Sequence, residues 1–232
     1  MMGEFTLEIA VESTGAAIGA ERGGADRIEL CADLSAGGLS PSPEVMRETR
    51  NAVRVPIFAM IRPRDGNFVY TPEEFTQMRT SIGVARERKM DGVVLGILQG
   101  NKNIDVIRTK GLVDFASPMP VTFHRAFDEC NDLTQGLEDV ISTGATRILT
   151  SGGASDVLAR IEVLQMLLQA ARNRIVIMPG GGIQPANFLR IRQSLGAMEF
   201  HSGLGGVFSY GTEDFGGFEE AVRCLKYGKL RG

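Results

Sequence analysis

The sequence has few of the residues that build disulfide frameworks and compact metal sites. Its 232 residues include three cysteines, which form no CxxC pair, and two histidines, which form no HxH or HExxH pair. An odd number of isolated cysteines indicates reduced thiols rather than disulfides, so we expect a cytoplasmic protein. The histidine spacing gives no metal-binding signature.

Long apolar runs and an excess of positive charge are also absent. No segment approaches the ~20 apolar residues that a membrane helix needs. The start, MMGEFTLEIAVES, lacks a basic region followed by an apolar stretch, so we expect no signal peptide. The formal net charge of -3 implies no broad basic surface. These features predict a protein that binds neither membranes nor nucleic acid.

What the sequence contains is a repeated alternation of short apolar runs with longer helical segments. Such alternation indicates βαβ units and a parallel sheet. Eight units in 232 residues fit an α/β fold, the (β/α)8 TIM barrel. An open doubly wound sheet is the alternative, but polar residues alternate in the first and last runs, which a barrel interior explains better. The expected strands span residues 5–10, 26–31, 56–62, 91–97, 120–125, 146–151, 174–179 and 198–202.

We expect a single domain over residues 1–232, with strand–helix units over about 5–200 and a glycine-rich loop and final helix over about 203–232. Thr71, Pro72 and Glu74 form a capping-box helix start, and Ser42 and Gln184 precede proline in the same way. The expected helices span residues 14–22, 43–53, 72–89, 105–116, 132–143, 155–171, 185–194 and about 218–227.

Loop composition indicates which end of the barrel carries the site. Connections that enter strands are short, as at residues 23–25 and 89–90. Connections that leave strands are longer and rich in glycine, proline and polar residues, as at 32–42, 63–71 and 203–217. Barrel enzymes build their sites from the second set of loops, so we expect the site at the C-terminal mouth.

Four ionisable side chains on four expected strands face away from their apolar neighbours. They are Glu8, Glu29, His124 and His201. We hypothesise a catalytic cluster, in which the glutamates on adjacent strands raise one carboxyl pKa and the histidines transfer or orient protons. The histidines with either glutamate are alternatively metal ligands. A further alternative is a purely structural set of buried ion pairs.

A second group of residues is predicted to bind an anion at the same mouth. Arginine side chains bind anions in bidentate fashion, and a nearby aspartate can orient them. Backbone N–H groups of glycine turns after the sixth and seventh strands suit a phosphate, although such a turn is often only a turn. The predicted anion-binding residues are Arg62, Arg64, Asp128, Thr150, Ser151, Gly180, Gly181 and Gly182.

One residue is a candidate ligand for a soft metal. Copper(I) prefers thiolate and thioether ligands, and the chain has three cysteines and ten methionines. Cys31 ends the second expected strand, near the mouth, where it could reach Met60 or Met178. The alternative is that these three residues only pack the core.

Seven segments of the chain have long and distinctive sequences, at residues 23–31, 37–42, 61–70, 121–128, 147–153, 178–183 and 199–203. Together they resemble the CutC family of copper homeostasis proteins, and the resemblance runs from residue 5 to about 203. It implies a cytoplasmic TIM barrel that forms homo-oligomers, with a dimer as the first expectation, and that binds copper(I). Ala10 stands where members of that family often have a cysteine, which leaves Cys31 as the copper ligand at the strand ends.

Three functions are compatible with these patterns. The first is the binding or handling of copper(I) in copper homeostasis, as the family resemblance implies. The alternative is an enzyme that acts on a small anionic or phosphorylated metabolite, with glutamate, arginine and histidine side chains performing acid–base chemistry. A third is a non-catalytic barrel whose polar cluster is only structural. Fold and family do not by themselves fix the chemistry.

Overall fold

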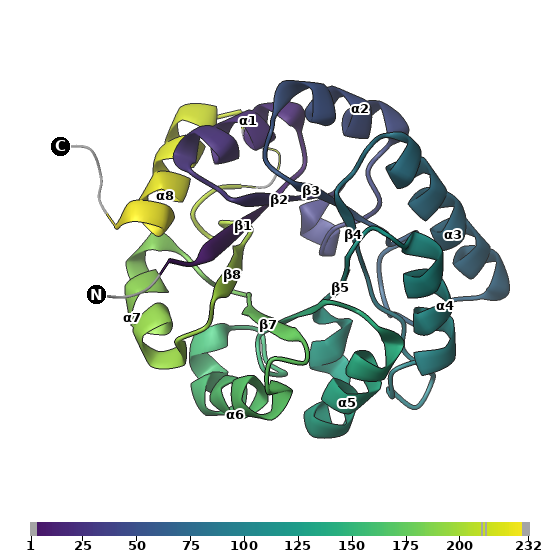
Figure 1. Ribbon diagram of the computed structural model, residues 1–232. Coiled ribbons are helices and arrows are strands. Elements are labelled where there is room, and N and C mark those ends of the chain that lie inside the picture. The colour runs from purple at the N-terminus through teal and green to yellow at the C-terminus, as the bar shows by residue number, and fades with distance from the viewer. Residues whose placement is uncertain (1–3, 210, 212, 229–232) are drawn as a thin grey trace.

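The computed structural model of the chain describes residues 4–209, 211 and 213–228. Eight parallel strands form a central barrel, and eight helices of the described chain surround it (Figure 1). This is the predicted (β/α)8 TIM barrel. The strands are β1 (Thr6–Val11), β2 (Arg27–Leu30), β3 (Ile57–Met60), β4 (Gly92–Leu95), β5 (Val121–Phe123), β6 (Arg147–Thr150), β7 (Val176–Pro179) and β8 (Glu199–Ser202).

The helices follow the strands in strict alternation, and three short 3-10 turns lie in the loops that leave β2, β5 and β6. The turns are η1 (Leu34–Ala36), η2 (Arg125–Glu129) and η3 (Val157–Arg160). The helices are α1 (Thr14–Gly23), α2 (Pro43–Ala52), α3 (Pro72–Glu87), α4 (Val106–Ala116), α5 (Leu133–Thr143), α6 (Ile161–Ala171), α7 (Pro185–Leu195) and α8 (Phe215–Tyr227).

The sheet closes between β7 and β8. Hydrogen-bonded neighbours run in the order β7-β6-β5-β4-β3-β2-β1-β8, and a single parallel bridge joins Gly180, just after β7, to His201 of β8. A Cβ atom at Gly180 would lie only 3.0 Å from the Cβ of His201. Glycine therefore allows the close approach of two backbones that closes the barrel.

Helix starts lie where the capping residues predict them. Thr71 and Glu74 form both bonds of a capping box at α3, and the Ser42 hydroxyl accepts the Val45 N–H at the start of α2. At α7, the Asn187 side chain accepts the N–H of Gln184. These bonds satisfy donors that the first helical turn leaves without partners.

Two helices differ from the prediction. The sequence predicts one helix over residues 155–171, but the structure has η3 followed by α6. The break arises because the Asp156 carboxylate accepts the Leu158 N–H and the Val157 N–H donates to the Gly181 carbonyl, which ties this segment to the loop after β7. The last helix begins at Phe215, earlier than predicted, because Asp214 caps it through Gly217 N–H.

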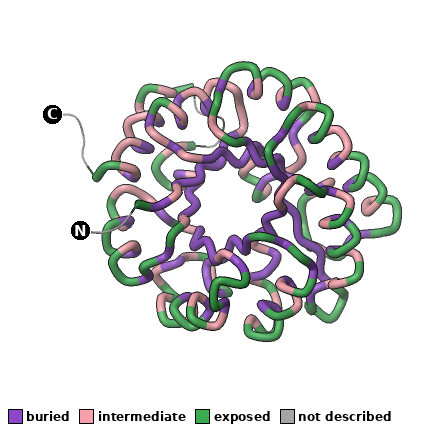
Figure 2. The backbone as a smooth tube through the Cα atoms, in the orientation of Figure 1, coloured by how far each residue is buried: buried purple, intermediate pink, exposed green. Residues whose placement is uncertain are grey.

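The apolar core lies between the barrel wall and the surrounding helices. Leu7, Ile9, Ile28 and Leu30 on β1 and β2 are fully buried in it, and Figure 2 shows the strands as a continuous buried ring. Over the described residues, no helix combines the length and the apolar character of a membrane-crossing segment. The predicted domain also includes residues 1–3, 210, 212 and 229–232, which lie outside the described residues.

Candidate functional site at the barrel mouth

A layer of paired charges fills the middle of the barrel. Glu8 on β1 is the register partner of Arg27 on β2, and the two form a buried ion pair. Arg27 also contacts Glu199 of β8 at 2.6 Å, and Arg147 of β6 contacts the same carboxylate at 2.6 Å. Because two acids and two bases alternate, the layer compensates the cost of burying its charges. We call these four residues the ionic layer.

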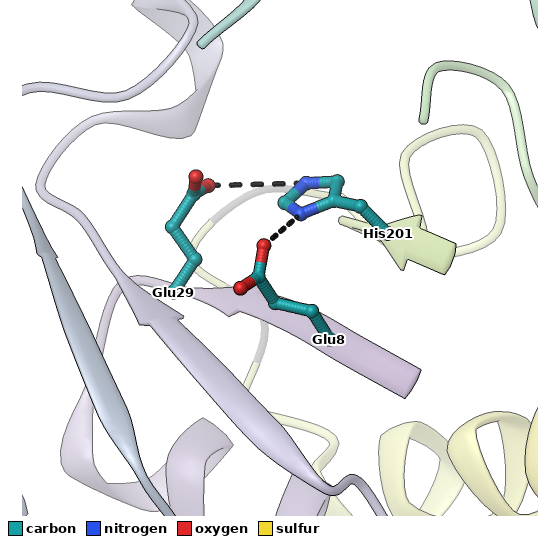
Figure 3. Close-up of side chains that lie close together, drawn as sticks. All are labelled: Glu8, Glu29 and His201. Atoms are coloured by element: carbon teal, nitrogen blue, oxygen red, sulfur yellow. Dashed lines mark hydrogen bonds and ion pairs between the residues drawn. The ribbon is translucent and has the colours of Figure 1, made fainter. Parts of the chain in front are cut away.

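Three of the four ionisable side chains predicted from strand alternation, Glu8, Glu29 and His201, lie together in the structure. His201 of β8 pairs in register with Glu8, and its Nδ1 lies 2.8 Å from Glu8 Oε1 (Figure 3). Its Nε2 lies 3.8 Å from Glu29 Oε2 on β2 (Figure 3). Glu8 therefore fixes the imidazole orientation, and the second ring nitrogen points toward Glu29.

The surroundings shift the three pKa values in different directions. Burial would raise the pKa of Glu8, but Arg27 and His201 lower it to about 2. Burial raises the pKa of Glu29, although His201 opposes this. Burial would lower the pKa of His201, but Glu29 and Glu8 raise it. Near pH 7 the cluster therefore combines a charged carboxylate with a neighbouring imidazole and carboxyl group that compete for a proton.

Glu29 and His201 line a cavity at the mouth. The cavity has a volume of about 340 Å³, near the lower end of the ~300–1,000 Å³ range of ligand sites. Its wall also includes Arg62, His124 and Arg125. Ala10, the register partner of Glu29, lines it too. The structure thus places both predicted histidines and one predicted glutamate around one space.

His124 presents a buried donor to this region. Its Nδ1 accepts the Ala126 N–H at 3.1 Å, which assigns the ring proton to Nε2. Nε2 is buried and has no hydrogen-bond partner among the described residues. Burial, with Arg62 nearby, lowers the pKa of His124 to about 3. The ring is therefore neutral near pH 7, and its Nε2–H has no acceptor among the described residues.

Arg62 is a buried cation without a carboxylate partner in the described part of the chain. Its guanidinium donates to the carbonyls of Ala36, Gly38 and Gly66 and lies over the ring of Phe68. Its Nε atom is buried and has no hydrogen-bond partner over residues 4–209, 211 and 213–228. Carbonyl oxygens orient the positive charge but do not neutralise it, so the wall favours an anion.

Arg125 is a further functional candidate that the sequence prediction missed. Its Nε donates to Asp128 at 2.8 Å, and Nη2 donates to the Ser151 hydroxyl and the Ala154 carbonyl. Strand alternation could not place this residue, because the chain turns into η2 directly after His124. Asp128, which the sequence proposed to orient an arginine, holds this one.

The other predicted anion-binding residues occupy different positions. Arg64 does not line the cavity and is committed to Glu74 at 2.6 Å. The Thr150 hydroxyl donates to Asp128, and Leu149 lines the cavity in its place. Ser151 supports Asp128 and Arg125 through its backbone and hydroxyl groups. Of the three glycines, Gly181 and Gly182 line the cavity, whereas Gly180 closes the sheet.

Cys31 lies beside the cluster but not in it. Its buried thiol is 3.6 Å from Glu29 Oε2 and packs with Phe58, Met60 and Val94. Burial and the adjacent Glu29 raise its pKa well above the ordinary value, which keeps the thiol protonated. The Met60 thioether packs in the same group, but a protonated thiol is not the thiolate that copper(I) prefers. The three-residue group able to hold an ion in the described chain is Glu8, Glu29 and His201.

The fold and the position of the cavity define a TIM-barrel protein with a polar site at the C-terminal mouth. The family model described as the CutC family matches residues 5–206, and the chain belongs to this family of copper homeostasis proteins. Both the predicted fold and the predicted family are thereby confirmed.

Relatives and solved structures agree with this assignment. The human "Copper homeostasis protein cutC homolog" is 44% identical over 197 residues, which are 85% of this chain and 72% of that protein. A CutC family protein from Chromobacterium violaceum is 41% identical, over 86% of this chain and 81% of its own. A solved CutC structure from Streptococcus agalactiae has a TM-score of 0.82 and 32% identity, and the match covers 86% and 98% of the two chains.

Proposed function

We propose that the mouth binds a small anionic metabolite and that Glu29 and His201 move protons on it. The observation that carries this proposal is the Glu8–His201–Glu29 arrangement at the edge of the cavity. His201 is held by Glu8 at 2.8 Å and directs its other nitrogen toward Glu29 at 3.8 Å. An oriented imidazole beside a carboxyl group of raised pKa is suited to general acid–base catalysis.

The opposite wall supports an anionic ligand. Arg62 is buried and has no carboxylate partner among the described residues, and Arg125 lines the same space. The free Nε2–H of His124 adds a neutral donor. Among the described residues, one buried polar atom each of Glu29, Arg62 and His124 has no hydrogen-bond partner, and all three residues line one cavity. A ligand that meets them would recover the cost of leaving them unpaired.

The proposed acid–base chemistry follows from the proton for which Glu29 and His201 compete. When Glu29 is ionised and His201 protonated, Glu29 can accept a proton from a ligand C–H or O–H group while His201 donates one to a ligand oxygen. Glu8 stays charged because its pKa is about 2, so it stabilises the imidazolium throughout. Proton abstraction by one group with proton donation by another is typical of isomerases and lyases that act on a carbon next to a carbonyl group.

Proton exchange with solvent tests this function across many candidate substrates at once. The protein is incubated in D2O with a panel of small carboxylated and phosphorylated metabolites, and loss of C–H signals is followed by proton NMR. We expect at least one compound to exchange, and Glu29→Gln to slow the exchange by about 100-fold or more. Glu138→Gln, which changes an exposed carboxylate paired with Arg174, is the matched control. Absence of both exchange and binding across the panel would contradict the proposal.

Copper handling is the second candidate, and the family assignment favours it. The ligand atoms of Glu8, Glu29 and His201 lie within 4.8 Å of one another. Imidazole and carboxylate groups suit copper(II) or zinc better than copper(I), which would depend on Cys31. Copper(I) is therefore titrated anaerobically against a chromophoric chelator. A copper(I) site at Cys31 requires Cys31→Ser to lower the affinity, and an unchanged affinity would exclude that ligand.

We also propose a cytoplasmic location and a homo-oligomer. Cys31, Cys130 and Cys224 are all free thiols, which suits a reducing compartment. Ile107 on α4 and Leu189 on α7 expose large apolar side chains on the outer helices, which could bury them against a second copy. Light scattering after size-exclusion chromatography tests the oligomer, and a monomer at all concentrations would contradict it.

A further inference from the structure

We propose that Arg125 holds a carboxylate group of the ligand, and that Asp156 beside Gly182 disfavours a phosphate at the same mouth. This inference rests on the proposed function and names its substrate class as small carboxylates. It assigns specificity to two residues that the sequence prediction did not include among the candidate site residues. Two observations support it, the geometry of the guanidinium group and the charge beside the glycine turn.

The guanidinium of Arg125 is fixed on two of its three nitrogens. Nε donates to Asp128 Oδ2, and Nη2 donates to the Ser151 hydroxyl and the Ala154 carbonyl, each at 2.8 Å. Nη1 takes part in none of these bonds, and Arg125 lines the cavity. Its two N–H groups therefore remain for a ligand. A side chain held in this way loses little conformational entropy when it binds.

Asp128 is the positioning residue for Arg125. Its side chain is almost fully buried, and it accepts bonds from the N–H groups of Ser151 and Gly153 and from the hydroxyl groups of Thr150 and Ser151. These bonds hold the carboxylate in place while Arg125 occupies its remaining side. Arg125 is therefore the arginine next to Asp128, whose predicted role was to orient such a side chain. Hydrogen bonds that hold Asp128 in place in turn preorganise the Arg125 guanidinium group for binding.

Gly181 provides the space that Arg125 needs. Its φ of +118° is a conformation that favours glycine, and a Cβ atom there would lie 3.3 Å from Arg125 Cζ. The glycine turn therefore brings its backbone against the guanidinium group. The turn serves the placement of Arg125 in addition to any direct contact with a ligand.

The same turn is poorly suited to a phosphate. Asp156 lies against Gly182, because an ideal Cβ there would be 2.7 Å from Asp156 Cγ. Like charges at short range repel, and a phosphate carries ~1.5–2 negative charges near pH 7 against one for a carboxylate. Arg125 and Asp156 pack against neighbouring glycines of this turn, so a carboxylate held by Arg125 meets the repulsion with one negative charge and a phosphate with more than one. Charge distribution therefore favours the smaller, singly charged group.

Pyruvate and inorganic phosphate are the probes that test this inference. Binding to the full chain is measured by calorimetry and by the Arg Nε–H and His signals in 15N NMR. We expect pyruvate to bind at least 10-fold more tightly than phosphate, and Arg125→Gln to weaken pyruvate at least 10-fold. Arg125→Lys should have an intermediate effect because it keeps the charge but not the fixed geometry. Arg174→Gln, an exposed arginine outside the mouth, is the control.

Asp156→Asn provides the second arm of the test. Asparagine retains a cap for Leu158 N–H, so the turn should be preserved. We expect this variant to bind phosphate several-fold more tightly than the original chain and pyruvate about equally. An unchanged phosphate affinity would overturn the role of Asp156.

The outcomes separate this inference from the proposed function. If both anions bind and Arg125→Gln, folded by circular dichroism, binds pyruvate as tightly as before, the role of Arg125 is wrong and the mouth site stands. If phosphate binds as tightly as pyruvate, carboxylate selection is wrong. If neither anion binds the original chain, this inference and the anion site of the proposed function both fail. Loss of proton exchange in Glu29→Gln is independent of all three results.

Discussion

The ionic layer and the mouth lie next to each other inside one barrel, yet they treat buried polar groups in opposite ways. In the layer, each carboxylate faces an arginine, and Arg147 also donates to Thr122. At the mouth, buried atoms of Glu29, Arg62 and His124 have no hydrogen-bond partner in the part of the chain that the structure describes. Both regions use the same residue types, so burial alone does not identify a site. Buried polar atoms without hydrogen-bond partners, in residues that line a cavity, identify a candidate site.

The difference also explains why the two regions have different roles. A completed ion-pair network specifies the barrel interior, and removing one member leaves an uncompensated charge. Buried polar groups without hydrogen-bond partners destabilise the free protein, and a ligand that supplies the missing bonds restores that stability. His201 links the two regions, because Glu8 of the layer holds one nitrogen and Glu29 at the mouth faces the other.

The largest expected effect comes from breaking the layer. Arg27→Met leaves Glu8 buried without its cation, and we expect the free energy of unfolding to fall by about 3–5 kcal/mol. Chemical denaturation monitored by circular dichroism measures it. Adding Glu8→Gln to the same variant removes the unpaired charge and should restore part of the loss. A single variant as stable as the original chain would show that the layer does not hold the barrel together.

A smaller effect on stability is expected at the mouth. Glu29→Gln keeps the shape of a side chain whose pKa is raised by burial and whose nearest cation is His201 at 3.8 Å. We expect the free energy of unfolding to change by no more than about 1 kcal/mol, while proton exchange is lost. A destabilisation as large as that of Arg27→Met would make Glu29 a structural residue and erase the distinction between the regions.

The two regions should also respond to different pH ranges. His124 has a folded pKa of about 3 against an ordinary 6.5, so its contribution to stability is present above pH 6.5 and is lost as pH falls toward 3. Glu8 has a folded pKa of about 2 against 4.5, so its contribution is lost below about pH 4.5.

His124→Asn separates these ranges. We expect the variant to lose less stability than the original chain between pH 6.5 and 4.5, measured as urea midpoints at each pH. The raised pKa of His201 acts in the opposite direction and is common to both proteins, so the comparison isolates His124. Identical pH profiles would show that His124 is not held neutral.

Much of this organisation could be predicted from the sequence because successive side chains of a strand point to opposite faces, with a period of two. That period brought Glu8, Glu29 and His201 to one face, and the parallel register aligned Glu8 with His201. Arg27 shares the face of Glu29, so the same rule applies to it, but only the structure shows that it joins Glu8 to Glu199. The eight strand–helix units follow equally from periodicity and capping residues.

The loops could not be predicted in the same way. Arg125 lies where the chain leaves β5 for a 3-10 turn, and Arg62 depends on carbonyls of two separate loops. The predicted pairing of Arg62 with Arg64 as an anion clamp depended on a loop conformation that instead turns Arg64 toward Glu74. The alternation of side chains between two faces applies only within a strand. Residues that lie on irregular backbone can therefore be placed only from the structure.

The most direct test of the incomplete mouth is 15N NMR of the two histidine rings near pH 7, with and without pyruvate. With only two histidines, each ring can be assigned from one variant. We predict that His124 is neutral with its proton on Nε2, and that this N–H signal shifts as pyruvate saturates the protein. A doubly protonated His124, or two rings whose signals do not move at saturating pyruvate, would contradict the claim that the mouth is completed by an anionic ligand.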